Sequence, residues 1–407
     1  MSNVIRGIGQ LATCPITGGQ DHIGIIEGAA LVQQQGRVVW VGKDNDLPAE
    51  FQSLDALDAQ GALVVPGLID CHTHLCFGGW RGDEFEMRIQ GQSYQAIAAA
   101  GGGIRSTVAA TRNTSQDDLT AKASAALAQI IQLGVTTLEC KSGYGLSVEH
   151  ELKQLCVYQS LQQSQPIELV PTFLGAHIVP PEYSEQRDVY VRLICDTMLP
   201  QIAEEKLAEF CDVYIDTGAF SLDEGKQILS RAKALGLGLK AHAEQLSYTG
   251  AAAMAASLGA ASLEHLEYLD HSDLQTIQQA GSVAVSLPFA SLYLRERYLD
   301  CRSLIEQGIP VAVATDFNPG SAPSYQLPMA MTLACLNQQM TPAEVLKACT
   351  IHAAKALQRE QRIGSLLPGF QADLAIINAP TVNHWMYHLQ SNACVGVMKN
   401  GNWVHQV

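Results

Sequence analysis

The chain has 407 residues, of which 47% are hydrophobic, and this is enough apolar material for a large buried core. Its length suits two or three domains, or one α/β barrel of about 250 residues with a smaller appendage. The net charge of -15 argues against nucleic acid or an anionic membrane surface as a partner, because both attract basic proteins. A negatively charged small substrate would therefore need a local cation.

The eleven cysteines are spread singly along the chain and include no Cys-x-x-Cys pair. This distribution favours reduced thiols over a disulfide framework. The first residues, Met-Ser-Asn-Val-Ile-Arg, lack the cationic and apolar regions of a secretory signal, and the chain has no run of about 18 apolar residues. We therefore expect a cytoplasmic location and no membrane partner.

Both ends of the chain have the character of short strands and turns. Residues 30–32 and 38–41 are apolar runs separated by Gln-Gln-Gln-Gly-Arg, and Asn400-Gly401 near the other end is a strong signal for a tight turn. We expect residues 1–60 plus 363–407 to form one composite small β domain, and residues 61–362 to form an α/β domain.

Within the α/β domain, apolar runs alternate with helical segments, which is the pattern of βα units around a parallel sheet. Eight such units predict a (β/α)8 TIM-like barrel, with chemistry at the carboxyl ends of its strands. A doubly wound sheet is the structural alternative, although no Gly-x-Gly-x-x-Gly follows the first strand. The predicted strands are 64–70, 135–140, 168–174, 212–216, 238–242, 262–266, 282–287 and 310–315. The predicted helices include 115–133, 147–164, 185–209, 221–235, 270–280, 326–338 and 342–357, with Ser115, Ser147 and Thr341 as caps.

The first of these strands ends in His72-Thr73-His74, and residues i and i+2 of a strand project to the same side. The two imidazoles can therefore share one ion, and zinc and related divalent metals accept imidazole nitrogen. An isolated His-x-His pair is commonly a surface or core feature that binds no metal, so a metal site also requires ligands at the other strand ends. The candidates there are Lys141, Tyr144, His177, Asp216, His242, His265 and Asp316. Five histidines, together with Asp316, at one barrel mouth predict a metal site.

These strand ends resemble those of the amidohydrolase superfamily of metal-dependent barrel hydrolases. Within it, the chain resembles the imidazolonepropionase family over nearly its whole length. The combination of Lys-Ser-Gly-Tyr-Gly with Thr-Asp-Phe-Asn-Pro-Gly-Ser is the most specific part of the resemblance. The blocks that carry it are Pro66–His74, Phe77–Gly79 with Arg81, Gly101–Ile104, Lys141–Gly145, Phe173–His177, His242–Leu246, His265–Glu267 and Ala314–Ser321.

The resemblance implies hydrolysis of the ring amide C-N bond of 4-imidazolone-5-propanoate to N-formimidoyl-L-glutamate, a step of histidine degradation. It also implies that His72, His74, His242 and Asp316 hold one divalent metal, zinc or iron. Such an ion would lower the pKa of a bound water and supply hydroxide near neutral pH. Asp316 would then take the water's proton and deliver it to the leaving nitrogen, while His265 would polarise the carbonyl.

Arg81 is the local cation that an acidic protein needs for a propanoate substrate, because its planar guanidinium matches a carboxylate with two hydrogen bonds. Glu244 and Gln245 leave an ambiguity, since a carboxylate could assist proton transfer whereas an amide could only form hydrogen bonds. We assign Gln245 to the substrate and keep Glu244 as a further catalytic candidate. The resemblance places the substrate contacts at Arg81, Tyr144, His177, Gln245, Asn318, Gly320 and Ser321.

Lys141 could suggest the carboxylated lysine that bridges two metals in some members of the superfamily. It follows the second strand, however, whereas the fourth strand ends in Asp216-Thr-Gly without a lysine, so we expect one metal. Three features depart from the family pattern: the sequence of Cys211–Asp216, the sequence of Leu287–Ser291, and Glu264 before His265. They leave the metal set intact and concern the pocket wall, mainly at the seventh strand.

Two other functions stay open from the sequence. One is a deaminase or cyclic amidase acting on another small heterocycle, for which the cation at Arg81 would not be required. The other is a non-catalytic barrel that serves as a scaffold, and an assay of metal content would separate it from an enzyme. Large metabolic barrels commonly pair, so a homodimer is a candidate assembly.

Overall fold

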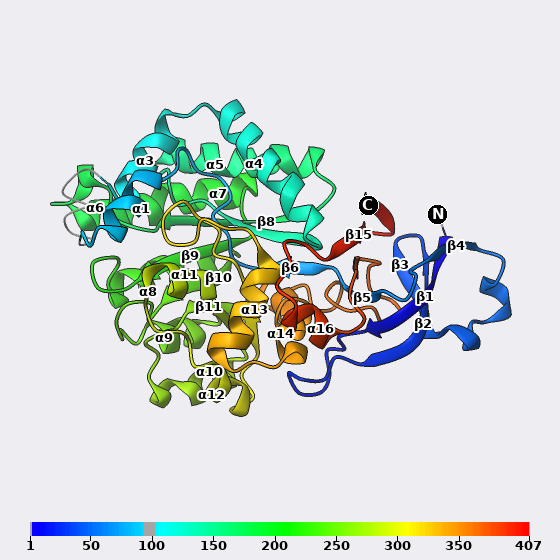
Figure 1. The fold of residues 1–407 in the computed structure, drawn as a ribbon. Coiled ribbons are helices and arrows are strands. Elements are labelled where there is room, and N and C mark those ends of the chain that lie inside the picture. Colours follow the sequence, from blue (N-terminus) through cyan, green and yellow to red (C-terminus); the bar gives the residue numbers. More distant parts are fainter. Residues whose placement is uncertain (1, 93–101, 407) are drawn as a thin grey trace.

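The computed structural model describes residues 2–92 and 102–406 and contains two eight-stranded sheets (Figure 1). The first sheet is built from both ends of the chain, in the order β16-β15-β14-β5-β1-β2-β3, with β4 paired to β1. The second has the order β13-β12-β11-β10-β9-β8-β7-β6, and all its ladders are parallel. Both chain termini lie on the first sheet, at one end of the barrel.

The strands of the first sheet are β1 (Ser2–Ala12), β2 (Ile25–Gln34), β3 (Arg37–Lys43), β4 (Asp55–Asp58), β5 (Leu63–Pro66), β14 (Leu374–Ile377), β15 (Cys394–Lys399) and β16 (Asn402–Gln406). The barrel strands are β6 (Leu68–Asp70), β7 (Val135–Lys141), β8 (Glu168–Ala176), β9 (Phe210–Ile215), β10 (Gly238–Ala243), β11 (Ser262–His265), β12 (Val283–Ser286) and β13 (Val311–Val313). Each predicted barrel strand therefore overlaps an observed one.

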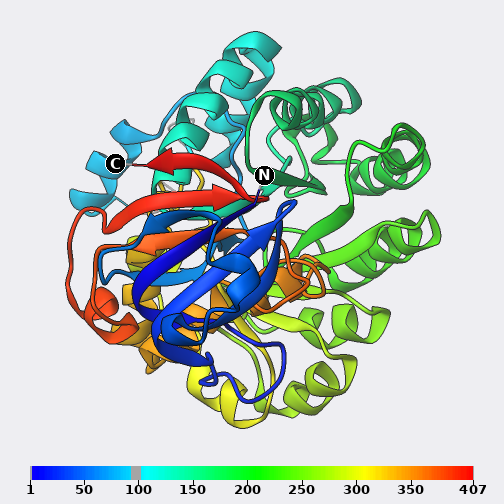
Figure 2. The ribbon, with the colours of Figure 1, turned by 90° about the vertical axis from the view of Figure 1, so that its right-hand side faces the viewer.

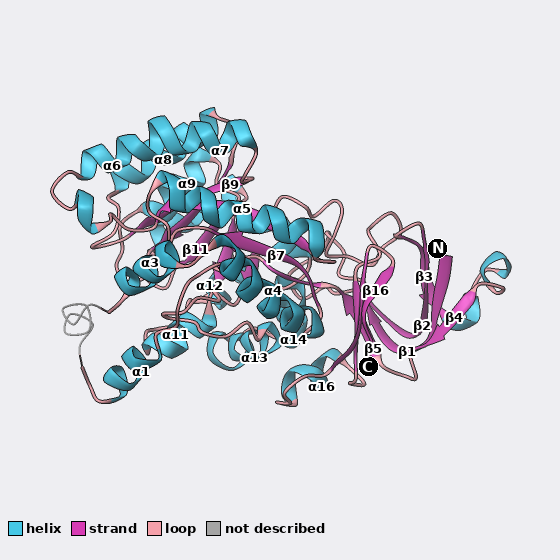
Figure 3. Ribbon diagram, turned by 90° about the horizontal axis from the view of Figure 1, so that it is seen from above, coloured by secondary structure: helices cyan, strands magenta, loops and turns pink. Residues whose placement is uncertain are grey.

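Helices surround the barrel, as Figures 2 and 3 show from two directions. They are α1 (Gly82–Ile89), α3 (Ile104–Asn113), α4 (Gln116–Gln132), α5 (Val148–Ser164), α6 (Arg187–Leu193), α7 (Leu199–Glu205), α8 (Leu222–Ala234), α9 (Ala251–Leu258), α10 (Leu274–Ala280), α11 (Pro288–Leu294), α12 (Cys301–Glu306), α13 (Leu327–Gln338), α14 (Pro342–Ala348), α15 (Ile351–Ala356) and α16 (Val382–Tyr387). Among the described residues, no helix combines the length and apolar character that crossing a membrane requires.

The predicted α/β class, with a (β/α)8 barrel and a small sheet from both termini, is confirmed. Three predicted caps are also confirmed, because the side chains of Ser115, Ser147 and Thr341 each accept a hydrogen bond from the backbone N–H three residues later. The domain boundaries at residues 60 and 363 stay predictions.

The apolar run at 64–70, predicted as one strand, is two strands in different sheets. β5 pairs with β1 and β14 in the first sheet, whereas β6 pairs with β7 in the barrel. Gly67 separates them, and a Cβ atom there would lie 2.4 Å from the buried side chain of Thr136. The chain can pass from one sheet to the other at this point because glycine has no side chain.

Some helices also differ from their predictions. The predicted helix 185–209 consists of α6, a π-helical turn at Ile194–Met198, and α7. The predicted helix 342–357 is divided into α14 and α15. Six helices of six to ten residues were not predicted, because such short segments carry little periodic signal: α1, α3, α9, α11, α12 and α16.

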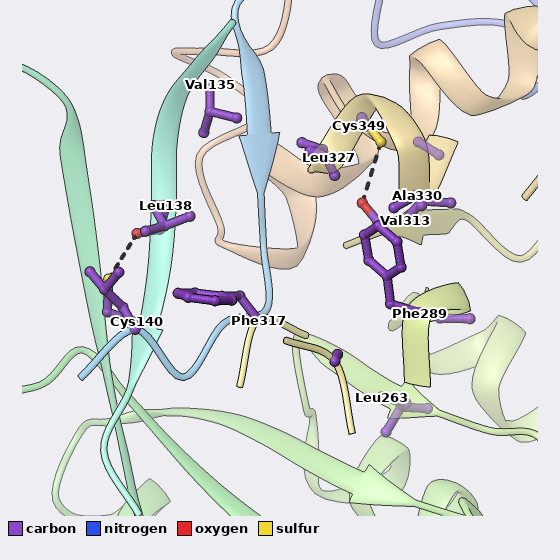
Figure 4. Close-up of a cluster of buried hydrophobic side chains, with 14 of the residues drawn as sticks. Val135, Leu138, Cys140, Leu263, Phe289, Val313, Phe317, Leu327, Ala330 and Cys349 are labelled. Carbon is purple, nitrogen blue, oxygen red and sulfur yellow. Dashed lines mark hydrogen bonds between the residues drawn. The ribbon is translucent and has the colours of Figure 1, made fainter. Parts of the chain in front are cut away.

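The outward faces of the barrel strands pack against the helices in one large apolar cluster. Leu138 and Cys140 of β7, Leu263 of β11 and Val313 of β13 all belong to it and are fully buried. Figure 4 shows a part of this cluster, in which the Cys349 thiol donates to the carbonyl oxygen of Val313 at 3.3 Å. This packing holds the strands that carry the polar side chains described below.

The barrel closes between its last strand and its first. The backbone N–H of Asp316 donates to the carbonyl of His72 at 3.0 Å, and that of His74 donates to the carbonyl of Phe317 at 2.9 Å. The carboxylate of Asp70 accepts hydrogen bonds from the backbone and hydroxyl of Thr315, at 3.1 and 2.6 Å. Segments 245 residues apart in the chain therefore lie side by side.

An ion cluster at the start of β8 connects the barrel to the first sheet. Oε1 of Glu168 accepts hydrogen bonds from Arg359 and Arg362, and its Oε2 lies 3.5 Å from Nζ of Lys399 on β15. Burial alone would raise the pKa of Glu168, but Lys399 and the two arginines outweigh it and lower this pKa to about 2.

We therefore predict that this carboxylate contributes to acid sensitivity. A lowered pKa stabilises the fold above the unfolded-state value near 4.5, and this contribution is lost as the pH falls from 4.5 toward 2. The shift corresponds to about 3 kcal/mol. Glu168→Gln should reduce the free energy of unfolding at pH 7 and flatten its decline between pH 4.5 and 2, as measured by urea denaturation. An equally steep decline in the variant would contradict the assignment.

Candidate metal centre

Alternation along the strands directs polar side chains into the barrel. On β10, Lys240 and His242 are two residues apart and project to the same side, as do Ser262 and Glu264 on β11. All four side chains are buried. The interior therefore contains a set of polar groups, and the apolar residues between them face the helices.

Three of the predicted metal ligands meet at the mouth of the barrel. His72, His74 and His242 are buried, and one nitrogen of each lies within 4.8 Å of the others. Oδ1 of Asp316 is 3.4 Å from Nε2 of His72 and 3.3 Å from Nε2 of His74. The structure thus brings the four predicted ligands together.

The chemistry of these donors fits a divalent cation. Nε2 of His72, Nδ1 of His74 and Nε2 of His242 are buried and form no hydrogen bond among the described residues. Buried polar atoms normally have a partner, and unpartnered ones require an explanation. Three imidazole nitrogens and one carboxylate are a donor set that zinc and iron accept.

Burial and the neighbouring charged groups shift the pKa values of these residues. Burial and Lys141 lower its pKa, but Glu264 and Asp316 outweigh them and raise it to about 9. Burial lowers the pKa of His242 to about 3 and also lowers that of His74. The neighbouring His72 and His74 hold the pKa of Asp316 well below its usual range, although burial opposes this. The site therefore favours a cation beside an ionised Asp316.

A carboxylate supports each of two candidate ligands. Nδ1 of His72 is hydrogen-bonded to Oε2 of Glu264 at 2.8 Å, and Nδ1 of His242 lies 3.0 Å from Oδ2 of Asp212. Carboxylates in this position fix the orientation of a metal-binding imidazole. In the sequence, Asp212 and Glu264 stand out only as parts of stretches that depart from the family pattern. Asp212 is two residues before Tyr214, and Glu264 is two residues after Ser262. Polar residues two apart in an apolar strand project to the same side, and this spacing could have identified both carboxylates.

His265 lies beside this group without being part of the three-histidine set. It ends β11 in a left-handed conformation with φ of 77°, and its ring centroid is 5.4 Å from that of His242. Its Nδ1 forms no hydrogen bond and is 3.7 Å from Oε2 of Glu267. The ring is therefore free to contact a molecule bound at the histidine cluster.

Tyr144 and His177 form an aromatic wall against His74. The rings of His177 and His74 are stacked with centroids 5.3 Å apart, and the Tyr144 centroid is 5.7 Å from that of His74. Burial raises the pKa of Tyr144, so its phenol keeps its proton. Arg81 lowers this pKa and Asp316 raises it, so Tyr144 lies within electrostatic reach of both.

The loop after β13 is organised by Asn318 and packs on Arg81. Oδ1 of Asn318 accepts the backbone N–H groups of Gly320 and Ser321, at 2.7 and 2.8 Å. Arg81 donates from Nε to Thr107 at 2.8 Å. A Cβ atom on Gly320 would lie 2.4 Å from Nη1 of Arg81, so any side chain at this position would displace the guanidinium from its present place. Three predicted substrate contacts thus share one loop.

Glu244 and Gln245 have different surroundings. The carboxylate of Glu244 accepts hydrogen bonds from Thr249 and from the backbone N–H groups of Ala251 and Ala252 at the start of α9. These contacts assign it to the helix end and do not favour the proton-transfer role that we expected. Gln245 is half-buried in the same loop.

Three other features of the sequence remain: Asp216, the glycine run and Lys141. Asp216, at the end of β9, holds this loop through hydrogen bonds from the backbone of Leu246 and the hydroxyl of Ser247. Gly101 of the glycine run lies outside the described residues. Lys141 is fully buried between Glu139 and Asp212, at 2.6 and 2.8 Å, so its ammonium forms ion pairs with carboxylates.

A family model described as the amidohydrolase family matches residues 63–404. Imidazolonepropionase from Symbiobacterium thermophilum is 44% identical, over 98% of this chain and 96% of its own. Imidazolonepropionase from Geobacillus kaustophilus is also 44% identical, over 94% of this chain and 91% of its own. A mutant atrazine chlorohydrolase from Arthrobacter aurescens, complexed with zinc and atraton, has the same fold with a TM-score of 0.74 at 17% identity, covering 99% of this chain and 95% of the other. The chain belongs to the amidohydrolase family, and within it to the imidazolonepropionase family.

Proposed function

We propose that the protein hydrolyses the ring amide C-N bond of 4-imidazolone-5-propanoate to N-formimidoyl-L-glutamate, a step of histidine degradation. The observation that carries this proposal is the meeting of His72, His74, His242 and Asp316 in one buried cluster. The name of the relatives at 44% identity supports the choice of substrate. Arg81 supplies the cation that a propanoate group requires.

The same four residues would hold one divalent ion, zinc or iron. When bound, the ion lowers the pKa of a coordinated water and so provides a nucleophile near neutral pH. The relative with known structure that is complexed with zinc supports zinc, and the donor set accepts iron equally well.

The protein's own groups would move the proton and stabilise the developing charge. Asp316 is ionised and buried, so it can accept a proton from the attacking water and deliver it to the leaving ring nitrogen. His265 has an unpartnered nitrogen beside the cluster and would polarise the substrate carbonyl. The catalytic role of Glu244 has no support from its contacts.

Orientation of the substrate would come from the rim of the barrel. Arg81 would bind the propanoate carboxylate with its guanidinium, next to the backbone of Gly320. Tyr144 and His177 would enclose the ring, since they already pack against His74. The remaining proposed contacts are Gln245, Asn318 and Ser321.

A cytoplasmic location is supported by the eleven cysteines, all of which are free thiols. The homodimer expected from the sequence stays a prediction, and light scattering would test it.

The reaction itself is tested with freshly generated 4-imidazolone-5-propanoate. Loss of its ultraviolet absorbance should accompany the appearance of N-formimidoyl-L-glutamate, identified by mass spectrometry. Chelator-treated protein should lose this activity and regain it with added zinc or iron. Metal-loaded protein that leaves the substrate unchanged would refute the proposal.

Asp316→Asn should lower kcat by about 10²–10⁴-fold, because an amide cannot accept the proton of the attacking water. It should also reduce the metal content, measured by elemental analysis, since an amide is a weaker ligand. Asp188→Asn is the control, because that carboxylate is exposed and pairs with Arg192 on the surface of α6. Unchanged kcat in the Asp316 variant would exclude the proton-transfer role.

Arg81→Met should raise KM about 10–100-fold, which corresponds to the loss of charged hydrogen bonds to a carboxylate. Metal content should stay the same. Arg187→Met, which removes a half-exposed guanidinium paired with Glu224, should leave KM unchanged. Equal effects of the two substitutions would remove the specific role of Arg81.

Gly320→Ala should also raise KM, because its methyl group would displace the Arg81 guanidinium. We expect a smaller increase than in Arg81→Met, with the metal content again unchanged. Gly82→Ala is the matched control, since a Cβ atom at Gly82 has no neighbour within 4 Å apart from the adjacent residues of the chain. Steady-state kinetics distinguish these cases, and a KM equal to that of the control would contradict the proposed contact.

A further inference from the structure

The barrel interior next to the histidine cluster contains five charged side chains that are not among the candidate metal ligands. Glu139, Lys141, Asp212, Lys240 and Glu264 are each fully buried. Buried ion pairs add little net stability, because the desolvation of both groups offsets their attraction. The arrangement of these five side chains therefore indicates a role other than stabilising the fold.

One lysine connects to His72 through a carboxylate. Nζ of Lys240 lies 3.4 Å from Oε1 of Glu264, and the other oxygen of Glu264 is hydrogen-bonded to Nδ1 of His72 at 2.8 Å. The same ammonium donates to the hydroxyl of Ser262 at 2.9 Å and to the carbonyl of Cys71, the residue before His72, at 3.5 Å. Lys240 thus contacts both the carboxylate that orients His72 and the backbone that carries it.

A second lysine connects to His242 in the same way. Nζ of Lys141 lies 2.8 Å from Oδ2 of Asp212, and this oxygen is 3.0 Å from Nδ1 of His242. Oδ1 of Asp212 accepts the backbone N–H of His242 at 3.1 Å. Glu139 connects the two lysines, since its Oε1 is 2.6 Å from Nζ of Lys141 and 3.8 Å from Nζ of Lys240.

We propose that Lys240 and Lys141 are positioning residues of the metal centre, each holding a carboxylate against Nδ1 of one histidine so that Nε2 of His72 and of His242 point at a shared cation. The inference rests on the metal site of the proposed function. Lys240 is the more informative of the two, because its ammonium contacts residues of β7 and β11 and the segment after β6, while its own strand carries His242. Loss of this one group should loosen the orientation of His72 without removing any ligand.

The test compares Lys240→Met with Lys399→Met in purified protein. Lys399 is a matched control, because it is also a buried lysine paired with a carboxylate, 2.7 Å from Asp373. It belongs to the ion cluster at the start of β8, outside the candidate metal site. The readouts are zinc affinity, from competition with a chromophoric chelator, the visible absorption spectrum of the cobalt(II)-loaded protein, and the thermal midpoint. They do not depend on turnover.

We expect Lys240→Met to weaken zinc affinity about 10–100-fold and to change the cobalt spectrum. Lys399→Met should lower the thermal midpoint while zinc affinity and spectrum stay those of the wild type. If Lys240→Met does not fold because Glu264 is left unpaired, the double variant Lys240→Met/Glu264→Gln removes both charges and should show the same loss of affinity.

Wild-type zinc affinity in a folded Lys240 variant would overturn this inference and leave the proposed function intact. An equal loss of affinity in Lys399→Met would also overturn it, since general destabilisation would then explain the effect. Wild-type protein that takes up neither zinc nor cobalt would refute the metal site itself, and the inference with it.

Discussion

The candidate site depends on the hydrogen bonds that close the barrel between β13 and β6. Asp316 donates its backbone N–H to His72, and His74 donates to Phe317, so the backbone of the last strand end lies directly beside the His-x-His segment. Asp316 adopts a left-handed conformation with φ of 55°, which is unfavourable for a non-glycine residue by about 1–3 kcal/mol. The closing bonds hold it there, and its carboxylate consequently faces both histidines.

The charged side chains inside the barrel are tolerated because groups of opposite charge lie together and apolar residues cover them. Three carboxylates and two ammonium groups lie together beside the histidines, so each charged group has an opposite charge close by. An apolar cluster that includes Val170 and Phe210 lies against them, with Nζ of Lys240 5.4 Å from the Phe210 ring centroid. Water is therefore excluded from one side, and electrostatic interactions inside are stronger than they would be in solvent.

Much of the fold could be predicted because the signals were local. An apolar run followed by a polar residue identifies a buried strand and its carboxyl end, and this sufficed to bring His242 and Asp316 into one predicted site. The division of 64–70 at Gly67 could not be predicted, because the reason is the side chain of Thr136 in a neighbouring strand. The contacts of Glu244 could not be predicted either. It is two residues from His242 in the sequence, but its carboxylate accepts hydrogen bonds from the first backbone N–H groups of α9.

Lys240 was missed, and the buried ion pairs of Lys141 were not predicted, for a related physical reason. A lysine within an apolar strand is ordinarily evidence against burial, and only the pairing of Lys240 with Glu264 across two strands makes it tolerable. That pairing depends on strand register, which aligns His242 with Glu264 and Lys240 with Ser262. Register follows from the whole barrel and is invisible in either segment alone.

The structure also separates the groups that would perform the chemistry from those that would choose the substrate. The candidate ligands lie in or just after barrel strands. β10 has ladders on both sides, and the segments after β6 and β13 are joined by backbone hydrogen bonds, so the ligand geometry should change little when loops vary. Arg81 and Gly320, in contrast, lie in loops. The Arg81 guanidinium packs so closely on Gly320 that a methyl group at this glycine would overlap it. A barrel can keep its hydrolytic centre while these loops change, and the proposed recognition of the carboxylate would therefore reside in the contact between the two loops.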